Sequence, residues 1–317
     1  MKITLDISKL VEAGKLSREE ADKLKALAAH DTGSLGVNIL IGFSVVAIAA
    51  GAVALAPTPL TAVSLGLALL PVGCMVVLNR MRHWTLLGQI CLIIGALLFG
   101  GGVIAYGAGS LASMLIVTVA FALAAVAARS SLLMVLSVLS ASACLGARTG
   151  YSHALYSLAI FEPTLTIMLF SSLALIAYQA SKRLPADYER LAITAARASL
   201  LLINLGFWIG SLWGDPLMLL HSMNAKNASF AFMTKTVIPA AVFSILWAIV
   251  LLGAGIWAVQ VNRRWLVNLV AVFAGIHFYT QWFERLGATP LSVLLGGLVM
   301  LASAVALWMF NRRVPDA

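Results

Sequence analysis

Apolar residues in this 317-residue chain occur in long runs that are separated by short polar segments. A helix needs about 20 mostly apolar residues to cross a hydrocarbon layer of about 30 Å. Runs of roughly this length occupy residues 35–56, 60–78, 84–106, 109–128, 131–147, 160–180, 191–213, 236–259, 265–286 and 289–310. The pattern predicts an all-α fold, a polytopic transmembrane helix bundle of about ten spans.

The third to fifth runs are the least clearly separated. Gly107-Ala108-Gly109 leaves almost no loop between two of them, and Arg129 alone marks the next boundary. A count of eight or nine spans therefore stays open. The triplet Gly100-Gly101-Gly102 predicts either the end of a helix or a broken span of the kind found in transporters.

Residues 1–34 precede the first apolar run and carry charges of both signs. Apolar residues at helical spacing predict two short amphipathic helices, separated at Gly14. Ser17 and Glu20 have the spacing of a capping box at the start of the second helix. We therefore expect two domains, a cytoplasmic helical hairpin at 1–34 and a transmembrane bundle at 35–317.

Composition supports a membrane location and excludes some partners. The chain is 62% hydrophobic and 10% charged, with a mean hydropathy of +0.99, whereas soluble domains are about 25% charged. A net charge of +9 could indicate nucleic acid binding. The basic residues sit in small groups between apolar runs, however, which is typical of topology signals, so no nucleic acid partner is expected.

The distribution of these charges predicts the orientation. With ten spans, 17 of the 21 Lys and Arg residues fall on the side of the N-terminus and four on the other side. Because cytoplasmic loops carry the excess of basic residues, both termini are expected in the cytoplasm. An odd number of spans would place Arg312 and Arg313 outside. We expect a multi-pass protein of the bacterial inner (plasma) membrane, with membrane lipids as partners.

Polar side chains gather in the ninth apolar run. His277, Gln281 and Glu284 are spaced to share one helix face, with Tyr279 nearby. His277 lies 12 residues beyond Trp265, about 18 Å along a helix. At that depth an ionisable group usually faces a partner or a wet cavity. The cluster could be a substrate-binding wall, a proton relay or, with His153 or His221, part of a metal site. The alternative is a hydrogen-bonded seam between helices.

Four further residues are expected on the outer face, namely His153, Glu162, Asp215 and His221. They could converge with the cluster around His277 in one outer pocket. The alternative is that these four side chains are simply exposed to water, as charged residues in loops usually are. The sequence contains no soluble-enzyme motif, so it predicts no catalytic residue, metal or cofactor.

Two parts of the chain resemble a known family. The first is the segment from Leu10 to Ala21, LVEAGKLSREEA, which is followed by Gly-rich apolar runs. The second begins at Asn262-Arg263-Arg264-Trp265 and continues through an aromatic-polar cluster to Leu294-Leu295-Gly296-Gly297. These segments resemble predicted bacterial membrane proteins of domain of unknown function family twenty-one fifty-seven. The resemblance implies a location and an architecture, but no activity and no site residues.

Three functions follow from these observations. The leading hypothesis is a non-enzymatic protein that transports or senses a small molecule or a lipid through an outward-opening polar cavity near His277, Gln281 and Glu284. The first alternative is a membrane-embedded enzyme acting on a lipid or lipid-linked substrate at the outer leaflet. The second is a membrane scaffold that binds a cytoplasmic protein through residues 1–34.

Overall fold

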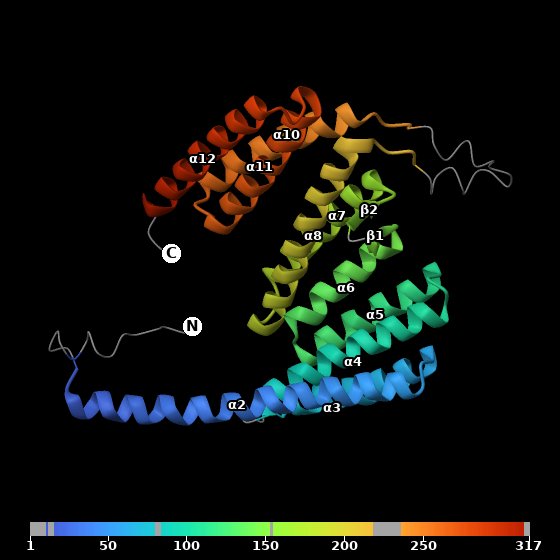
Figure 1. The fold of residues 1–317 in the computed structure, drawn as a ribbon, viewed down its shortest axis with the longest axis vertical. Coiled ribbons are helices and arrows are strands. Elements are labelled where there is room, and N and C mark those ends of the chain that lie inside the picture. The colour runs from blue at the N-terminus through green and yellow to red at the C-terminus, as the bar shows by residue number, and fades with distance from the viewer. Residues whose placement is uncertain (1–10, 12–15, 80–83, 153–154, 218–235, 314–317) are drawn as a thin grey trace. The chain divides into compact units, whose positions relative to one another are not determined.

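The computed structural model describes residues 11, 16–79, 84–152, 155–217 and 236–313. These residues form ten long helices and one two-stranded hairpin (Figure 1). The helices are α2 (Arg18–Leu55), α3 (Pro59–Leu78), α4 (Thr85–Tyr106), α5 (Leu111–Ala128), α6 (Ser131–Cys144), α7 (Pro163–Ser181), α8 (Ala186–Trp213), α10 (Ala240–Gln260), α11 (Arg264–Leu286) and α12 (Pro290–Arg313). The strands are β1 (Ala147–Ser152) and β2 (Leu155–Ile160).

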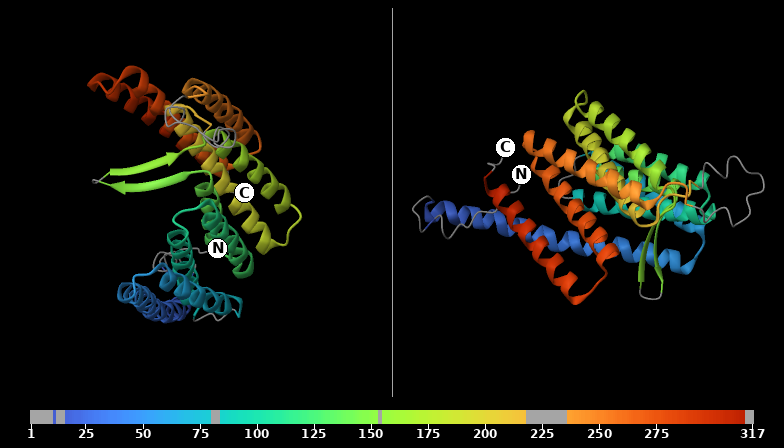
Figure 2. Two further views of the ribbon diagram at one scale, coloured as in Figure 1. Left: turned by 90° about the vertical axis from the view of Figure 1, so that its right-hand side faces the viewer. Right: turned by 90° about the horizontal axis from the view of Figure 1, so that it is seen from above.

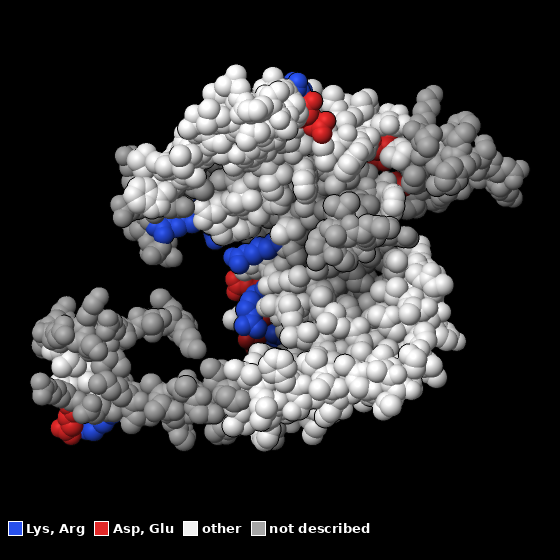
Figure 3. Space-filling view, viewed as in Figure 1, with Lys and Arg blue, Asp and Glu red and all other residues white. Residues whose placement is uncertain are grey.

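Seven of the described helices are long and apolar enough to cross a membrane, namely α3, α4, α5, α7, α8, α10 and α11. The apolar parts of the other three are shorter, at Ile39–Leu55, Ser131–Cys144 and Pro290–Ala306. On the face shown in Figure 3, charged side chains are confined to a few places and most of the described surface is uncharged. The expected helical membrane bundle is confirmed, while the count of ten spans stays a prediction.

The chain divides within α6 into two compact units, residues 1–137 and 138–317. In the first unit, α3 and α4 pack so closely that their glycines meet backbone atoms. A Cβ at Gly66 would lie 2.5 Å from the backbone nitrogen of Phe99, and one at Gly95 would lie 2.9 Å from that of Leu70. Such close approach is how helices associate in lipid, where hydrophobic attraction between helices is absent.

A small apolar core joins α4, α5 and the start of α6 in this first unit. Its buried members are Leu92, Ala96, Val117, Phe121, Ala125, Ala128 and Leu133. The glycine triplet lies inside α4, which continues to Tyr106 without a break. A Cβ at Gly100 would lie 2.7 Å from the ring of Phe121, and one at Gly102 would lie 2.8 Å from the Pro59 carbonyl oxygen. The triplet therefore neither breaks nor ends the helix, and its glycines at positions 100 and 102 allow close packing.

The weakly separated runs are distinct helices. Ala108 and Gly109 have positive φ values of 49° and 71° between α4 and α5. Arg129 has a φ of 50° at the end of α5, and the Ser130 hydroxyl then accepts the Leu133 N–H at 3.4 Å at the start of α6. One residue in the left-handed region is enough to reverse the chain at this boundary.

In the second unit, α8 packs against both α7 and α10. Two glycines allow this, because a Cβ at Gly206 would lie 3.1 Å from Ile167 of α7, and one at Gly210 would lie 2.6 Å from the Phe243 ring of α10. The helices α10, α11 and α12 follow one another as antiparallel neighbours (Figure 1). This arrangement leaves one side of α10 and α11 open.

The β-hairpin departs from the all-helical expectation. It occupies a segment that we expected to be a loop, with Ala147 opposite Ile160 and Ser152 opposite Leu155. It projects beyond the helices of the second unit (Figure 2). The two connecting residues, His153 and Ala154, are not the Asn-Gly or Asp-Gly pair that signals a tight hairpin, so the sequence pattern did not reveal it.

The start of α2 has the expected capping box. The Ser17 hydroxyl accepts the Glu20 N–H at 3.2 Å, and the Ser17 N–H donates to the Glu20 carboxylate at 3.0 Å. However, α2 continues from Arg18 to Leu55, so the helix has no break at the expected domain boundary of residue 34. Apart from Val11, the first helix of the expected hairpin lies outside the described residues.

Candidate functional site

A groove runs along the open side of the α10–α11 pair. It consists of two adjoining hollows of about 620 Å³ and about 640 Å³, which share Ala248, Leu252 and His277. Ser244 and Gln260 mark its ends on α10, about 24 Å apart at ~1.5 Å per residue. The groove therefore extends over most of a hydrocarbon layer about 30 Å thick.

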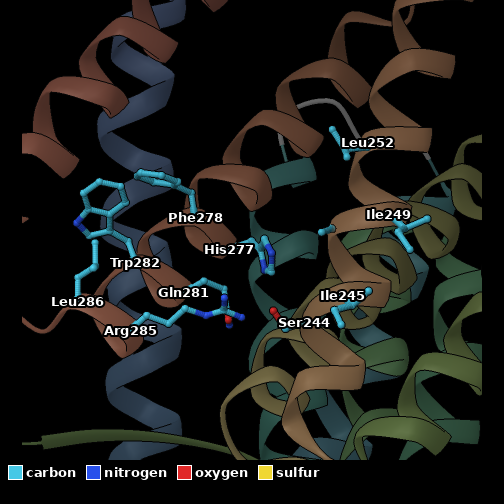
Figure 4. Close-up of a pocket in the computed structure, with 11 residues that line it drawn as sticks. Ser244, Ile245, Ile249, Leu252, His277, Phe278, Gln281, Trp282, Arg285 and Leu286 are labelled. Carbon is cyan, nitrogen blue, oxygen red and sulfur yellow. The ribbon is translucent and has the colours of Figure 1, made fainter.

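The lining of the groove changes along its length. Beyond His277 it is apolar apart from Gln260. At the other end, His277, Gln281 and Arg285 extend from α11 towards α10, where Ser244 lies (Figure 4). Because these three residues are spaced four apart, they form one stripe on α11. The surface of the groove is thus mostly apolar, and its polar side chains lie at the end where α10 begins and α11 ends.

The walls of the groove are held by hydrogen bonds to α8. Trp247 of α10 is fully buried and donates from Nε1 to the Asn204 side-chain oxygen at 3.0 Å. Trp208 of α8 donates from Nε1 to the Thr280 hydroxyl of α11, also at 3.0 Å. Each bond satisfies a polar atom within apolar surroundings. Together they fix α10 and α11 on the same helix, which sets the width of the groove.

The imidazole of His277 is placed by Trp247. The two rings meet edge to face, with centroids 4.9 Å apart and planes at 72°. Nδ1 of His277 is buried and has no hydrogen-bond partner among the described residues. A buried polar atom without a partner costs about 1–3 kcal/mol, and it is satisfied when a ligand or water supplies the missing bond. Among the residues that line the groove, His277 is therefore the one with a buried polar atom left without a partner.

Two members of the predicted cluster lie elsewhere. Glu284 is exposed and does not line the groove. Tyr279 stacks on Phe283 at 5.4 Å between ring centroids, and its ring would lie 3.8 Å from a Cβ at Gly296 of α12. Tyr279 thus belongs to the packing of α11 with α12.

Arg285 and Ser244 also line the groove, although they were not among the residues predicted from the sequence. Arg285 lies eight residues after His277, so the same helical spacing that links His277 to Gln281 also predicts its position. Ser244 lies in an apolar run with no pattern that distinguishes it. The stripe that faces the groove is therefore His277, Gln281 and Arg285.

Two of the four expected outer residues, Asp215 and Glu162, are buried, and the first of them bonds to the start of α7. Asp215 is fully buried, and one of its carboxylate oxygens accepts the Thr164 N–H at 2.8 Å in the first turn of α7. Glu162, 2% exposed, precedes that helix, and its side chain makes no capping hydrogen bond there. Asp215 therefore supplies the cap of α7 from a distant part of the sequence.

Asp215 also connects α7 with the beginning of α10. Its second carboxylate oxygen accepts the Leu217 N–H at 2.7 Å, and its backbone N–H donates to the Ile238 carbonyl at 3.0 Å. Ile238 lies two residues before α10, the helix that carries Ser244. In the described structure Asp215 thus has a positioning role for one wall of the groove.

The remaining expected outer residues, His153 and His221, lie outside the described residues. A metal site that includes either of them stays a hypothesis. Comparisons with protein-family models, with curated proteins and with solved structures found no match to this chain. The case for a function therefore rests on the groove and its residues.

Proposed function

We propose that this multi-pass membrane protein is a transporter that accepts an amphipathic molecule from the lipid phase into the α10–α11 groove. The single observation that carries the proposal is the long, mostly apolar groove with a few polar side chains at one end, where His277, whose buried Nδ1 has no hydrogen-bond partner among the described residues, lines both hollows. An amphiphile could place its polar group against the stripe of His277, Gln281 and Arg285 and its apolar part along Ile249 and Leu252.

Transport is favoured over sensing because of the length of the groove. A sensor needs only a binding site at one end of such a groove. This groove continues past His277 for about three further turns of α10, as far as Gln260. The groove thus offers a continuous path along most of the hydrocarbon thickness. It lies along the side of the α10–α11 pair, whereas the sequence led us to expect a polar cavity that opens outward.

A membrane-embedded enzyme has less support. Acid-base catalysis on a bound lipid usually needs two titratable groups within reach of it. Among the described residues that line the groove, no carboxylate accompanies His277. The scaffold alternative depends on residues 1–34 and stays a hypothesis. Membership of domain of unknown function family twenty-one fifty-seven also stays a prediction.

Reconstituted liposomes test the proposal. The purified protein is inserted into vesicles that contain a fluorescent phospholipid analogue, and dithionite is added outside to quench the analogue in the outer leaflet. Transport predicts that quenching proceeds beyond the outer-leaflet half, faster than in protein-free vesicles. The variant Ile249→Trp, which fills the groove, is expected to slow this phase.

Leu298→Trp provides the matched control, because Leu298 of α12 is 54% exposed and Ile249 is 60% exposed, but Leu298 does not line the groove. It should leave the rate unchanged. Quenching that stops at one half with the unaltered protein would contradict transport. Equal slowing by both tryptophan variants would contradict the assignment to this groove.

A further inference from the structure

The charge of the groove is concentrated at one end. Arg285 is the only formally charged residue among its described lining residues, and it lies in the last turn of α11, opposite Ser244 near the start of α10. Arg side chains at such a position bind phosphate or carboxylate groups, with a planar fork of N–H donors. An occupant that matches this end carries a negative charge.

A second donor lies one helical turn deeper. Gln281 precedes Arg285 by four residues, about 6 Å along the helix, and both side chains line the same hollow (Figure 4). Its amide can donate to a neutral carbonyl oxygen. A glycerophospholipid has this order of groups, since its phosphate is followed, towards the membrane centre, by the ester carbonyls of its acyl chains.

The apolar part of the groove continues the same order. Ile245, Ile249 and Leu252 line the hollow alongside the polar stripe, and Leu252 also lines the next hollow. The whole groove is about 24 Å long, whereas one leaflet contributes about 15 Å of hydrocarbon. One acyl chain can therefore lie in the groove while its headgroup is held at Arg285.

We propose that the groove selects an anionic glycerophospholipid, whose phosphate is bound by Arg285 and whose ester carbonyl accepts a hydrogen bond from Gln281. The inference rests on the proposed function in that both place an amphiphile in the same groove. It goes further by assigning the chemical class of the ligand and one contact to each of two side chains.

Native mass spectrometry of the delipidated full chain tests the charge contact. Phosphatidylglycerol and phosphatidylcholine with identical acyl chains are added in turn, and bound lipid is counted. A basic residue near anionic lipid contributes about 1 kcal/mol, so we expect about fivefold preference for phosphatidylglycerol. Arg285→Gln should remove the preference, whereas Arg285→Lys should retain most of it and shows that the protein remains folded. Arg183→Gln, an exposed arginine outside the groove, serves as the control.

Diether phosphatidylglycerol, which has no ester carbonyl, tests the contact to Gln281. The unaltered protein should bind the diester more tightly than the diether by about two- to tenfold, as expected for one hydrogen bond. Gln281→Leu should abolish this difference while leaving the preference for phosphatidylglycerol over phosphatidylcholine intact. An unchanged diester preference in that variant would overturn the assignment to Gln281.

Two outcomes would overturn the proposal as a whole. One is equal binding of phosphatidylglycerol and phosphatidylcholine by the unaltered protein. The other is displacement of phosphatidylglycerol by oleate at equal concentration, because a simple carboxylate would then satisfy the site. Selective binding without movement of lipid in the liposome assay would contradict transport but leave this inference standing. Movement of lipid without selective binding would contradict this inference but leave transport standing.

Discussion

Replacement of Asp215 by alanine is expected to be one of the most destabilising single changes in the second unit. The carboxylate is fully buried and accepts two backbone N–H groups, from Thr164 at 2.8 Å and from Leu217 at 2.7 Å. Alanine removes both acceptors and leaves two amides unsatisfied near a helix N-terminus. Hydrogen bonds to a charged group contribute about 1.5–3 kcal/mol each, so the loss of two should be about 3–6 kcal/mol.

Asparagine at this position separates the two contributions. Its amide has one acceptor oxygen, so Asp215→Asn can keep one of the two hydrogen bonds and should cost about half as much as alanine. Glu189→Gln is the control, because Glu189 is exposed near the start of α8 and such changes usually stay within about 0.5 kcal/mol. The free energy of unfolding can be compared by SDS titration in mixed micelles, followed by tryptophan fluorescence.

The expected order of stability is the unaltered protein with Glu189→Gln, then Asp215→Asn, then Asp215→Ala. Hydrogen exchange should also become faster at the Val237 and Ile238 amides, which donate to the Asp215 backbone carbonyl at 2.9 Å and 3.0 Å. A loss below about 1 kcal/mol for Asp215→Ala would refute the reasoning, since it would mean that the two amides find other partners at little cost.

Three further predictions concern other parts of the chain. Gly95→Leu should destabilise the first unit by about 1–3 kcal/mol, because a Cβ at Gly95 would already lie 2.9 Å from the Leu70 nitrogen. Gly101→Leu is the control, since a Cβ at Gly101 would have no atom within 4 Å, and it should cost far less in the same SDS titration. Gly214→Ala should be more destabilising than Gly287→Ala, although both glycines have φ near +70°. Only at Gly214 would the added Cβ meet a backbone oxygen, that of Ile238, at 2.5 Å. Equal losses of stability in thermal unfolding would show that backbone strain alone determines the cost. The pKa of Glu20 is held below its ordinary value of 4.5, first by the hydrogen bond from the Ser17 backbone N–H and then by that from its hydroxyl. The cap is therefore complete above pH 4.5 and is lost as the pH falls through the lowered pKa, which carbon NMR titration of the Glu20 carboxyl should show and Ser17→Ala should reduce.

The helical part of the fold could be predicted because lipid imposes one strong rule, that every backbone polar group is satisfied within its own segment. Run length alone located the helices, and one residue such as Arg129 was enough to separate two of them. The hairpin of β1 and β2 could not be found in this way, because its stability comes from pairing between strands whose connecting residues carry no turn signal. The continuity of α2 was also missed, because a polar helix can extend an apolar one without any local signal.

The candidate site was predicted in part. Helical spacing correctly grouped His277 with Gln281, but it favoured Glu284 over Arg285 as the third member, because at about 100° per residue a step of seven residues returns closer to the His277 face than a step of eight does. Only the position of α10 decides which of the two faces the groove. Asp215 and Thr164 lie 51 residues apart in sequence, and their contact depends on how α7 and α8 pack.

The most direct test of the account is to find where an anionic phospholipid touches the protein. Phosphatidylglycerol with a photoreactive diazirine in one acyl chain is added to the full chain in nanodiscs, and the labelled residues are identified by peptide mass spectrometry. The account predicts labelling concentrated on the groove residues Ile245, Ile249 and Leu252 of α10, which decreases with Arg285→Gln. Labelling spread equally over exposed residues of α12 such as Leu298, and unaffected by Arg285→Gln, would contradict it.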